Sequence, residues 1–112
     1  MKLLAPAPGW TATADVIVVG SWRWHPGVIG IVASRLVERF YRPTVLIALD
    51  GEGGKGSGRS IRGLHLYKAL QGCADSLQTF GGHEMAAGLS LHRDRVATFA
   101  REFEAAARSA LS

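Results

Sequence analysis

Cysteine, long apolar runs and signal-peptide features are scarce or absent in this chain of 112 residues. The single cysteine, Cys73, excludes an internal disulfide and leaves too few thiolates for a structural zinc site, which fits a reducing cytoplasm. The longest apolar runs, such as 45–49, are too short to cross a bilayer, and the first residues lack the apolar core of a signal peptide. We therefore expect a cytoplasmic protein with no membrane partner.

Metal-binding and nucleophile patterns are also missing. The four histidines are not paired at ligand spacing, and the nine acidic residues form no cluster of the Asp-His-His or His-x-x-x-His kind. No serine lies in a nucleophile elbow, so a self-contained hydrolase is not expected. Residues 51–56 have the spacing of a dinucleotide-binding loop, but the helix that must follow comes too late. Lys55 is followed by glycine, which excludes a Walker loop.

What is present is the composition of one globular domain with a modest excess of positive charge. Apolar residues make up 47% of the chain and charged residues 20%, both in the range of folded proteins. A chain of this length buries about two-thirds of its unfolded surface in one core. The formal charge of +4 favours a polyanionic partner, although many basic proteins bind nothing acidic.

The order of apolar patterns predicts an α/β fold: a single domain with a mixed β-sheet, a parallel βαβ unit and flanking helices. The runs 15–20 and 44–49 are typical of strands covered on both faces. Between them, apolar residues recur at helical spacing from Val28 to Phe40, with Pro26 suited to the first turn. We expect the two strands to be parallel and joined by a right-handed crossover.

Further elements are expected downstream, and a leader is expected upstream. The sequence predicts a turn at 51–54, a strand at 56–61, a helix at 64–71 ended by Gly72, a strand at 86–91 and a final helix capped by Asp94. The inner face of that helix is expected to hold Val96, Phe99, Ala100, Phe103, Ala107 and Ala110. Residues 1–14 are interpreted as a leader, linker or edge segment, and 15–112 as the domain.

Two glycine-rich segments, 55–60 and 81–88, are the candidate ligand sites. Glycine lets backbone N–H groups approach an anion, and Lys55 and Arg59 supply charge-assisted hydrogen bonds. In a strand, Ser57 shares a face with Arg59, and a guanidinium beside a hydroxyl can hold a phosphate. The alternative is a solvent-facing arginine on an edge strand. Together the segments suggest one phosphate site.

Two further places carry side chains with possible chemistry. His83, after Gly81 and Gly82, can donate to a phosphate or act as a general acid, or it is a loop histidine bonded to backbone. Small residues at 86–88 are expected to reflect close packing. Residues 22–25, Trp-Arg-Trp-His, lie where the first strand meets its helix; either an indole stacks on a base, or one tryptophan caps the core while the other lies at its edge.

Three stretches, in this order, closely resemble the DHH-associated domain of RecJ-type exonucleases. They are 24–36 (WHPGVIGIVASRL), 56–61 (GSGRSI) and 80–88 (FGGHEMAAG). Three ordered motifs are more specific than any one, and the resemblance covers roughly 15–111. It implies a module that closes over the catalytic cleft of a 5′-to-3′ exonuclease of single-stranded DNA, used in recombination and repair. Manganese or magnesium is then expected in a separate DHH domain, and this segment alone should be inactive.

The resemblance also implies site residues and partners. Ser57, Arg59 and Ser60 fall on the family's phosphate-contacting segment, and Gly81, Gly82 and His83 on its glycine-rich substrate motif. Trp24 and His25 match its helix-start motif and either touch DNA or organise the fold, and His83 is expected to shape the assembled active site. Residues 1–14 and Trp22-Arg23 inherit no role. The implied partners are single-stranded DNA, the DHH domain of the same parent protein and, as a further expectation, other DNA-repair proteins.

Two alternatives stay open. One is the associated domain of a DHH-superfamily phosphodiesterase that acts on short oligonucleotides or cyclic dinucleotides, although the long helix-start match favours the RecJ type. The other is a stand-alone nucleic-acid-binding or protein-interaction module. Nuclease activity on addition of a DHH domain would separate an enzyme subunit from a pure binder.

Overall fold

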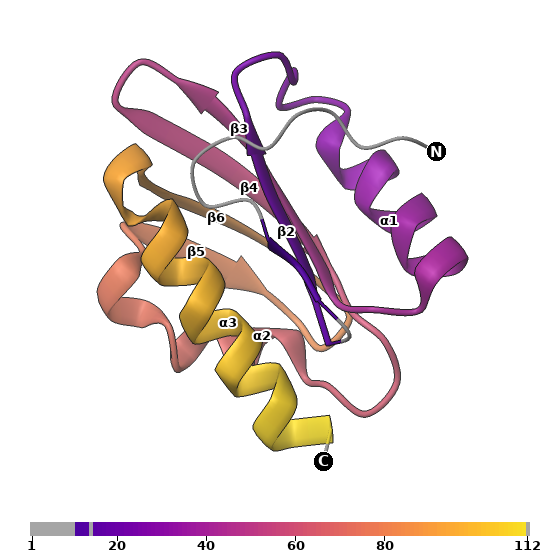
Figure 1. The fold of residues 1–112 in the computed structure, drawn as a ribbon. Coiled ribbons are helices and arrows are strands. Elements are labelled where there is room, and N and C mark those ends of the chain that lie inside the picture. The colour runs from indigo at the N-terminus through magenta and orange to yellow at the C-terminus, as the bar shows by residue number, and fades with distance from the viewer. Residues whose placement is uncertain (1–10, 14, 112) are drawn as a thin grey trace.

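The sheet at the centre of the molecule is mixed and twisted (Figure 1). The structure is a computed structural model that describes residues 11–13 and 15–111. Within these residues, six strands lie in the order β1-β2-β3-β4-β6-β5. They are β1 Thr11–Ala12, β2 Ile17–Ser21, β3 Thr44–Asp50, β4 Gly53–Arg59, β5 Thr79–Gly82 and β6 Ala86–His92. The helices are α1 Ile29–Phe40, α2 Leu66–Gln71 and α3 Val96–Leu111, with 3₁₀ turns at Ala74–Ser76 and Arg93–Arg95.

The predicted βαβ unit is confirmed. Strands β2 and β3 are parallel, with Ile17 opposite Thr44, and α1 connects them. The helix ends where Tyr41 adopts a left-handed conformation with φ of 49°, two residues before Pro43. Its start differs from expectation: Pro26 lies three residues before the helix, because the N–H of Val28 donates to the carbonyl of His25 in a separate turn.

Helices cover the two faces of the sheet unequally. One apolar cluster joins α1 to β2 and β3, and a larger one joins α2 and α3 to the other face of β2, β3 and β6. Strand β3 is therefore buried on both faces from Thr44 to Leu49. The inner residues predicted for α3 are buried, and the rings of Phe99 and Phe103 stack at 5.7 Å, but Ala110 is exposed, contrary to expectation.

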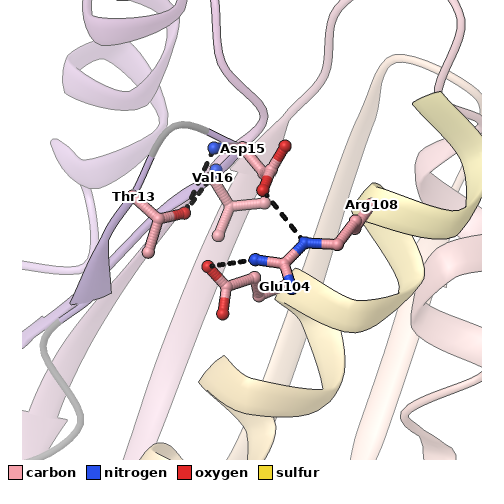
Figure 2. Close-up of polar contacts among 5 residues, drawn as sticks. All are labelled: Thr13, Asp15, Val16, Glu104 and Arg108. Carbon is pink, nitrogen blue, oxygen red and sulfur yellow. Dashed lines mark hydrogen bonds and ion pairs between the residues drawn. The ribbon is translucent and has the colours of Figure 1, made fainter. Parts of the chain in front are cut away.

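Polar contacts tie the start of β2 to the last turns of α3 (Figure 2). Arg108 Nε donates to Asp15 Oδ2 at 3.3 Å, and its Nη2 lies 3.6 Å from Glu104 Oε2. The Thr13 hydroxyl oxygen accepts from the backbone N–H groups of Asp15 and Val16. Exposed ion pairs of this kind contribute at most about 1 kcal/mol each, so they orient the α3 end rather than hold the fold together.

Several predicted boundaries were wrong in informative ways. The strand predicted at 56–61 spans Gly53–Arg59, so the turn is shorter than expected, and the edge strand β5 was not predicted. Asp94 is not a helix cap: it lies in the 3₁₀ turn, where its N–H donates to His92 Nδ1. The second helix begins at Leu66 after His65, whose imidazole accepts from the N–H of Lys68.

The predicted leader is only partly described. Thr11–Ala12 pairs with β2 as a short antiparallel edge strand. Residues 1–10, 14 and 112 lie outside the described residues, and the boundary at 15 stays a prediction. No helix within 11–13 and 15–111 is both long and apolar enough to cross a membrane.

Candidate phosphate-binding site

Strand β4 presents polar side chains to one face of the sheet and glycines to the other. Lys55, Ser57 and Arg59 point to the α1 side, as predicted for Ser57 and Arg59 from strand alternation. The intervening positions, Gly54, Gly56 and Gly58, are buried on the α2 and α3 side. A Cβ on Gly56 would lie 2.7 Å from Leu89 Cδ1. These glycines therefore admit core side chains from neighbouring strands.

The backbone of β4 is already paired on both sides. Ser57 lies opposite Leu46 of β3 and opposite Gly88 of β6, so the N–H groups of this central strand belong to the two ladders. This corrects the expectation that bare N–H groups of segment 55–60 approach an anion. The groups available to a ligand here are the side chains of Lys55, Ser57 and Arg59.

The Arg59 guanidinium lies over Ser57 beneath the first turn of α1. Arg59 is half-buried, and its Nη1 donates to Ser57 Oγ at 3.0 Å and to the Gly58 carbonyl at 2.7 Å. A Cβ on Gly30 would lie 2.7 Å from Arg59 Nη2 and 3.1 Å from Ser57 Oγ, so a larger residue at this position would push the guanidinium aside. No ion pair among the described residues involves Arg59, so no carboxylate there neutralises its charge.

The α1 end that meets Arg59 is itself electropositive. The N-cap residue Val28 makes no side-chain cap hydrogen bond, and the first turn holds no acidic residue. The first N–H groups of a helix lack partners within the helix and carry the positive end of its dipole. The Arg59 guanidinium and the Ser57 hydroxyl come from the predicted glycine-serine strand, and the helix end comes from the predicted helix-start motif. The fold thus brings the two motifs together.

The second glycine-rich segment lies beside the first, in register with it. Ser57 is opposite Gly88, which is opposite Gly81 on the edge strand. A Cβ on Gly81 would have no neighbour within 4 Å among the described residues, and one on Gly88 would meet only the Gly56 carbonyl at 3.8 Å. Close packing, expected for 86–88, applies to the buried Ala87 but not to Gly88. Internal contacts therefore do not explain these two glycines, which leave a bare backbone floor.

This surface, which we call the open sheet face, consists of the α1-side residues of three strands. They are Lys55, Ser57, Arg59, Thr79, Gly81, Ala86, Gly88 and Ser90. Sequence reasoning missed Thr79 and Ser90, whose hydroxyls lie 2.6 Å apart. The signal was the alternation of small residues with buried Ala87, Leu89 and Leu91 along β6.

His83 lies in the turn from β5 to β6, at the Arg59 end of the open sheet face. Its N–H donates to the Ala86 carbonyl, and Ala86 is the residue opposite Arg59. The imidazole is exposed, with Nδ1 3.4 Å from the N–H of Met85. Gly82 before it has φ of +146°, and a Cβ there would lie 2.5 Å from the Ala86 carbonyl, so this glycine is required by the turn itself.

Three predicted site residues have structural partners within the domain. Ser60 is 3% exposed, and its hydroxyl donates to the Leu64 carbonyl at 2.7 Å, which anchors the loop before α2. Trp24 is half-buried against the α1-side core, whereas Trp22 is exposed at the edge. His25 is exposed, but its Nδ1 accepts from the N–H of Gly27 at 2.9 Å and shapes the turn before α1.

Lys55 borders a cavity of about 420 Å³ on the same side of the sheet. Pro26, Asp50, Gln78 and Ser90 also line it. Its volume is in the range of small-molecule sites, roughly 300–1,000 Å³. The cavity is next to the Ser57–Gly88 pair, because the Lys55–Ser90 pair that borders it is two residues further along the same two strands.

Metal ligands and an activated thiol are not part of this site. In the part of the chain that the structure describes, no three His, Cys, Asp or Glu side chains gather as a metal-binding group. Burial, together with the charge of Glu102, raises the pKa of Cys73 to about 12. That thiol is therefore protonated at neutral pH and is not a nucleophile.

Comparison with known proteins gives a consistent result. Residues 13–109 match the family model of the DHHA1 domain. The single-stranded-DNA-specific exonuclease RecJ of Bacillus subtilis (strain 168) is 55% identical over 82 residues, which cover 71% of this chain and 10% of that protein. Its counterpart in Escherichia coli (strain K12) is 52% identical over 86 residues, covering 71% of this chain and 15% of that protein.

A solved structure agrees with the sequence relatives. RecJ in complex with Mg²⁺ from Thermus thermophilus superposes with a TM-score of 0.78 at 41% identity, covering 85% of this chain and 15% of that chain. This chain therefore spans only 10–15% of the length of these relatives.

Proposed function

This chain belongs to the DHHA1 domain family, and from that premise we propose that it holds the substrate of a 5′-to-3′ exonuclease of single-stranded DNA. In this proposal Arg59 and Ser57 bind the terminal phosphate. The observation that carries it is the meeting of the uncapped α1 end with a guanidinium and a hydroxyl beside a bare floor. Sequence relatives that are RecJ exonucleases support the choice of substrate.

Each part of the site has a defined role in this proposal. The planar guanidinium matches two phosphate oxygens, the Ser57 hydroxyl donates to a third, and the helix end adds positive potential. Gly88 and Gly81 leave room for the first sugar and base to lie flat on the sheet. His83, at the same end of the sheet, contributes to the assembled active site and can donate a proton or a hydrogen bond there.

The remainder of the parent protein supplies the metal chemistry. The related structures are described as bound to Mg²⁺ or Mn²⁺, which supports a metal centre in a DHH domain outside this chain. Such ions activate water and stabilise the oxygens of an in-line phosphoryl displacement. This chain then closes over that centre and fixes the strand. A cytoplasmic location and a role in recombination and repair are part of the same proposal.

The first experiment measures binding of single-stranded DNA by Arg59→Ala. Wild-type protein should prefer a 5′-phosphorylated oligonucleotide to a 5′-hydroxyl one, and the variant should lose that preference. Its affinity should also depend less on salt, by about one phosphate contact. Fluorescence anisotropy at several salt concentrations gives both quantities.

A matched control removes an arginine from the opposite side of the molecule. Arg101 is an exposed residue of α3. Arg101→Ala should change neither the 5′-phosphate preference nor the slope of affinity against salt concentration. Arg59→Lys, which keeps the charge but loses the planar fork, should fall between wild type and Arg59→Ala. Circular dichroism checks that each variant is folded. An unchanged slope and preference in folded Arg59→Ala would refute the proposal.

The same titrations address the two alternatives. Tighter binding of a cyclic dinucleotide than of a 5′-phosphorylated strand, again dependent on Arg59, would favour the phosphodiesterase alternative. Binding that ignores the 5′ end but follows total charge would favour a stand-alone nucleic-acid module.

A further inference from the structure

We propose that the DNA strand runs along β4 from Arg59 toward Lys55, with the terminal phosphate on Arg59 and the next phosphate on Lys55. The second nucleotide then occupies the cavity beside Lys55. This inference rests on the proposed function and adds the direction of the strand and a second binding position.

The spacing of the cationic groups supports a path of one nucleotide. Arg59 does not extend away from the strand: its Nη1 bonds to Ser57 Oγ, so the guanidinium lies above Ser57. Ser57 and Lys55 are two residues apart on one face, or about 6.6 Å along the strand. That separation is comparable with the distance between adjacent phosphates of an extended single strand.

The order of the two positions follows from their surroundings. The Arg59 end lies beside the turn that holds His83 and beneath the first turn of α1, and Arg59 and Ser57 are half-buried there. The Lys55 side chain is exposed, and no ion pair among the described residues involves it. A half-buried guanidinium beside a helix start suits the strand end, where the phosphate bears the larger charge, and the exposed lysine suits a continuing backbone.

The cavity beside Lys55 has the chemistry of a nucleoside position. Its lining combines the flat, apolar surface of Pro26 with the hydroxyl of Ser90 and the amide of Gln78. Asp50 lines it as well and would repel a phosphate placed near its carboxylate. The phosphate is therefore kept at the Lys55 side, while the sugar and base fill the interior.

The test compares ligands of increasing length on the full 112-residue chain. Thymidine 5′-monophosphate, the 5′-phosphorylated dithymidine and the trithymidine are titrated against wild type, Lys55→Ala and Arg59→Ala. Lys55→Ala should bind the mononucleotide like wild type and the longer ligands roughly fivefold more weakly, as for loss of one exposed charge contact. Arg59→Ala should weaken all three.

A neutral linkage identifies which phosphate Lys55 contacts. Replacing the first internal phosphate of the dithymidine by an uncharged methylphosphonate should weaken wild-type binding about as much as Lys55→Ala does, and should leave Lys55→Ala unaffected. Lys68→Ala, an exposed lysine on α2, is the charge-matched control and should change nothing.

The outcomes separate this inference from the proposed function. The strand path is wrong if Arg59→Ala weakens binding but the methylphosphonate weakens binding to Lys55→Ala as much as binding to wild type. It is also wrong if Lys55→Ala lowers the affinity for the mononucleotide as much as for the longer ligands. In both cases the terminal phosphate site on Arg59 stands. If Arg59→Ala changes no ligand, the proposed function fails, and the strand path fails with it.

Discussion

Glycine meets two structural needs in this domain, and we propose a third role for glycines that meet neither. Gly56 makes room for Leu89 in the core, and Gly82 adopts a backbone conformation that other residues rarely reach. Gly88 and Gly81 have neither reason, since their Cβ positions are open among the described residues. We propose that glycines of the last kind face the ligand, although all glycines look alike in the sequence.

Substituting alanine at two neighbouring glycines should separate packing from binding. Gly56→Ala should lower the free energy of unfolding by about 1–3 kcal/mol, because its Cβ would overlap Leu89 in a filled core. Gly88→Ala should keep that free energy or raise it by about 0.5–1 kcal/mol, because alanine loses less backbone entropy on folding. Urea denaturation measures both.

The same pair has opposite expectations for ligand binding. Gly88→Ala places a methyl group on the floor of the open sheet face and should weaken DNA binding, whereas folded Gly56→Ala should bind normally. Equal destabilisation by the two substitutions would contradict this division of roles.

At the scale of elements, the bounds of the β4 strand were wrong and the β5 strand was missed where glycine replaces the usual apolar residue. In β4 every core-facing position is glycine. The sequence therefore alternates glycine with polar residues, instead of the apolar and polar alternation that marks a half-buried strand. β5, Thr79–Gly82, has only Phe80 to mark its inner face. By contrast, β2, β3 and α1 were predictable because their apolar patterns follow directly from burial by helices.

The contact between α1 and β4 gives a prediction at this scale. Gly30 is the second residue of α1, and Gly30→Ala should keep or raise thermal stability, because alanine loses less backbone entropy than glycine on folding, by about 0.5–1 kcal/mol. Its Cβ would nevertheless displace the Arg59 guanidinium, which it would approach to 2.7 Å. Preference for a 5′-phosphate should therefore fall while the melting temperature does not.

A neighbouring residue on the same helix supplies the control. Ile31→Ala removes an exposed side chain, 62% accessible, and should leave the 5′-phosphate preference intact. A loss of binding by Gly30→Ala that tracks a loss of stability would show that the residue serves the fold alone.

For the whole molecule, the sequence predicted that two distant glycine-rich segments meet, and strand pairing confirms it through the row of Ser57, Gly88 and Gly81. It did not reveal which groups face outward. That depends on side-chain direction and burial, which turned Ser60 inward and left Trp24 against the core. Motif resemblance selected the two segments that the sheet brings together, while the register determined which of their side chains share a face.

The last prediction concerns the division of labour between this domain and the rest of a parent protein. The chain spans only 10% of the Bacillus subtilis relative, and its described residues gather no group of metal ligands. We expect the purified chain to leave 5′-phosphorylated single strands intact with Mn²⁺. A chimera of that relative, with its matched segment replaced by this domain, should degrade them, and Arg59→Ala should slow the chimera. Degradation by the chain alone, abolished by EDTA and by Arg59→Ala, would place the catalytic centre in this domain instead.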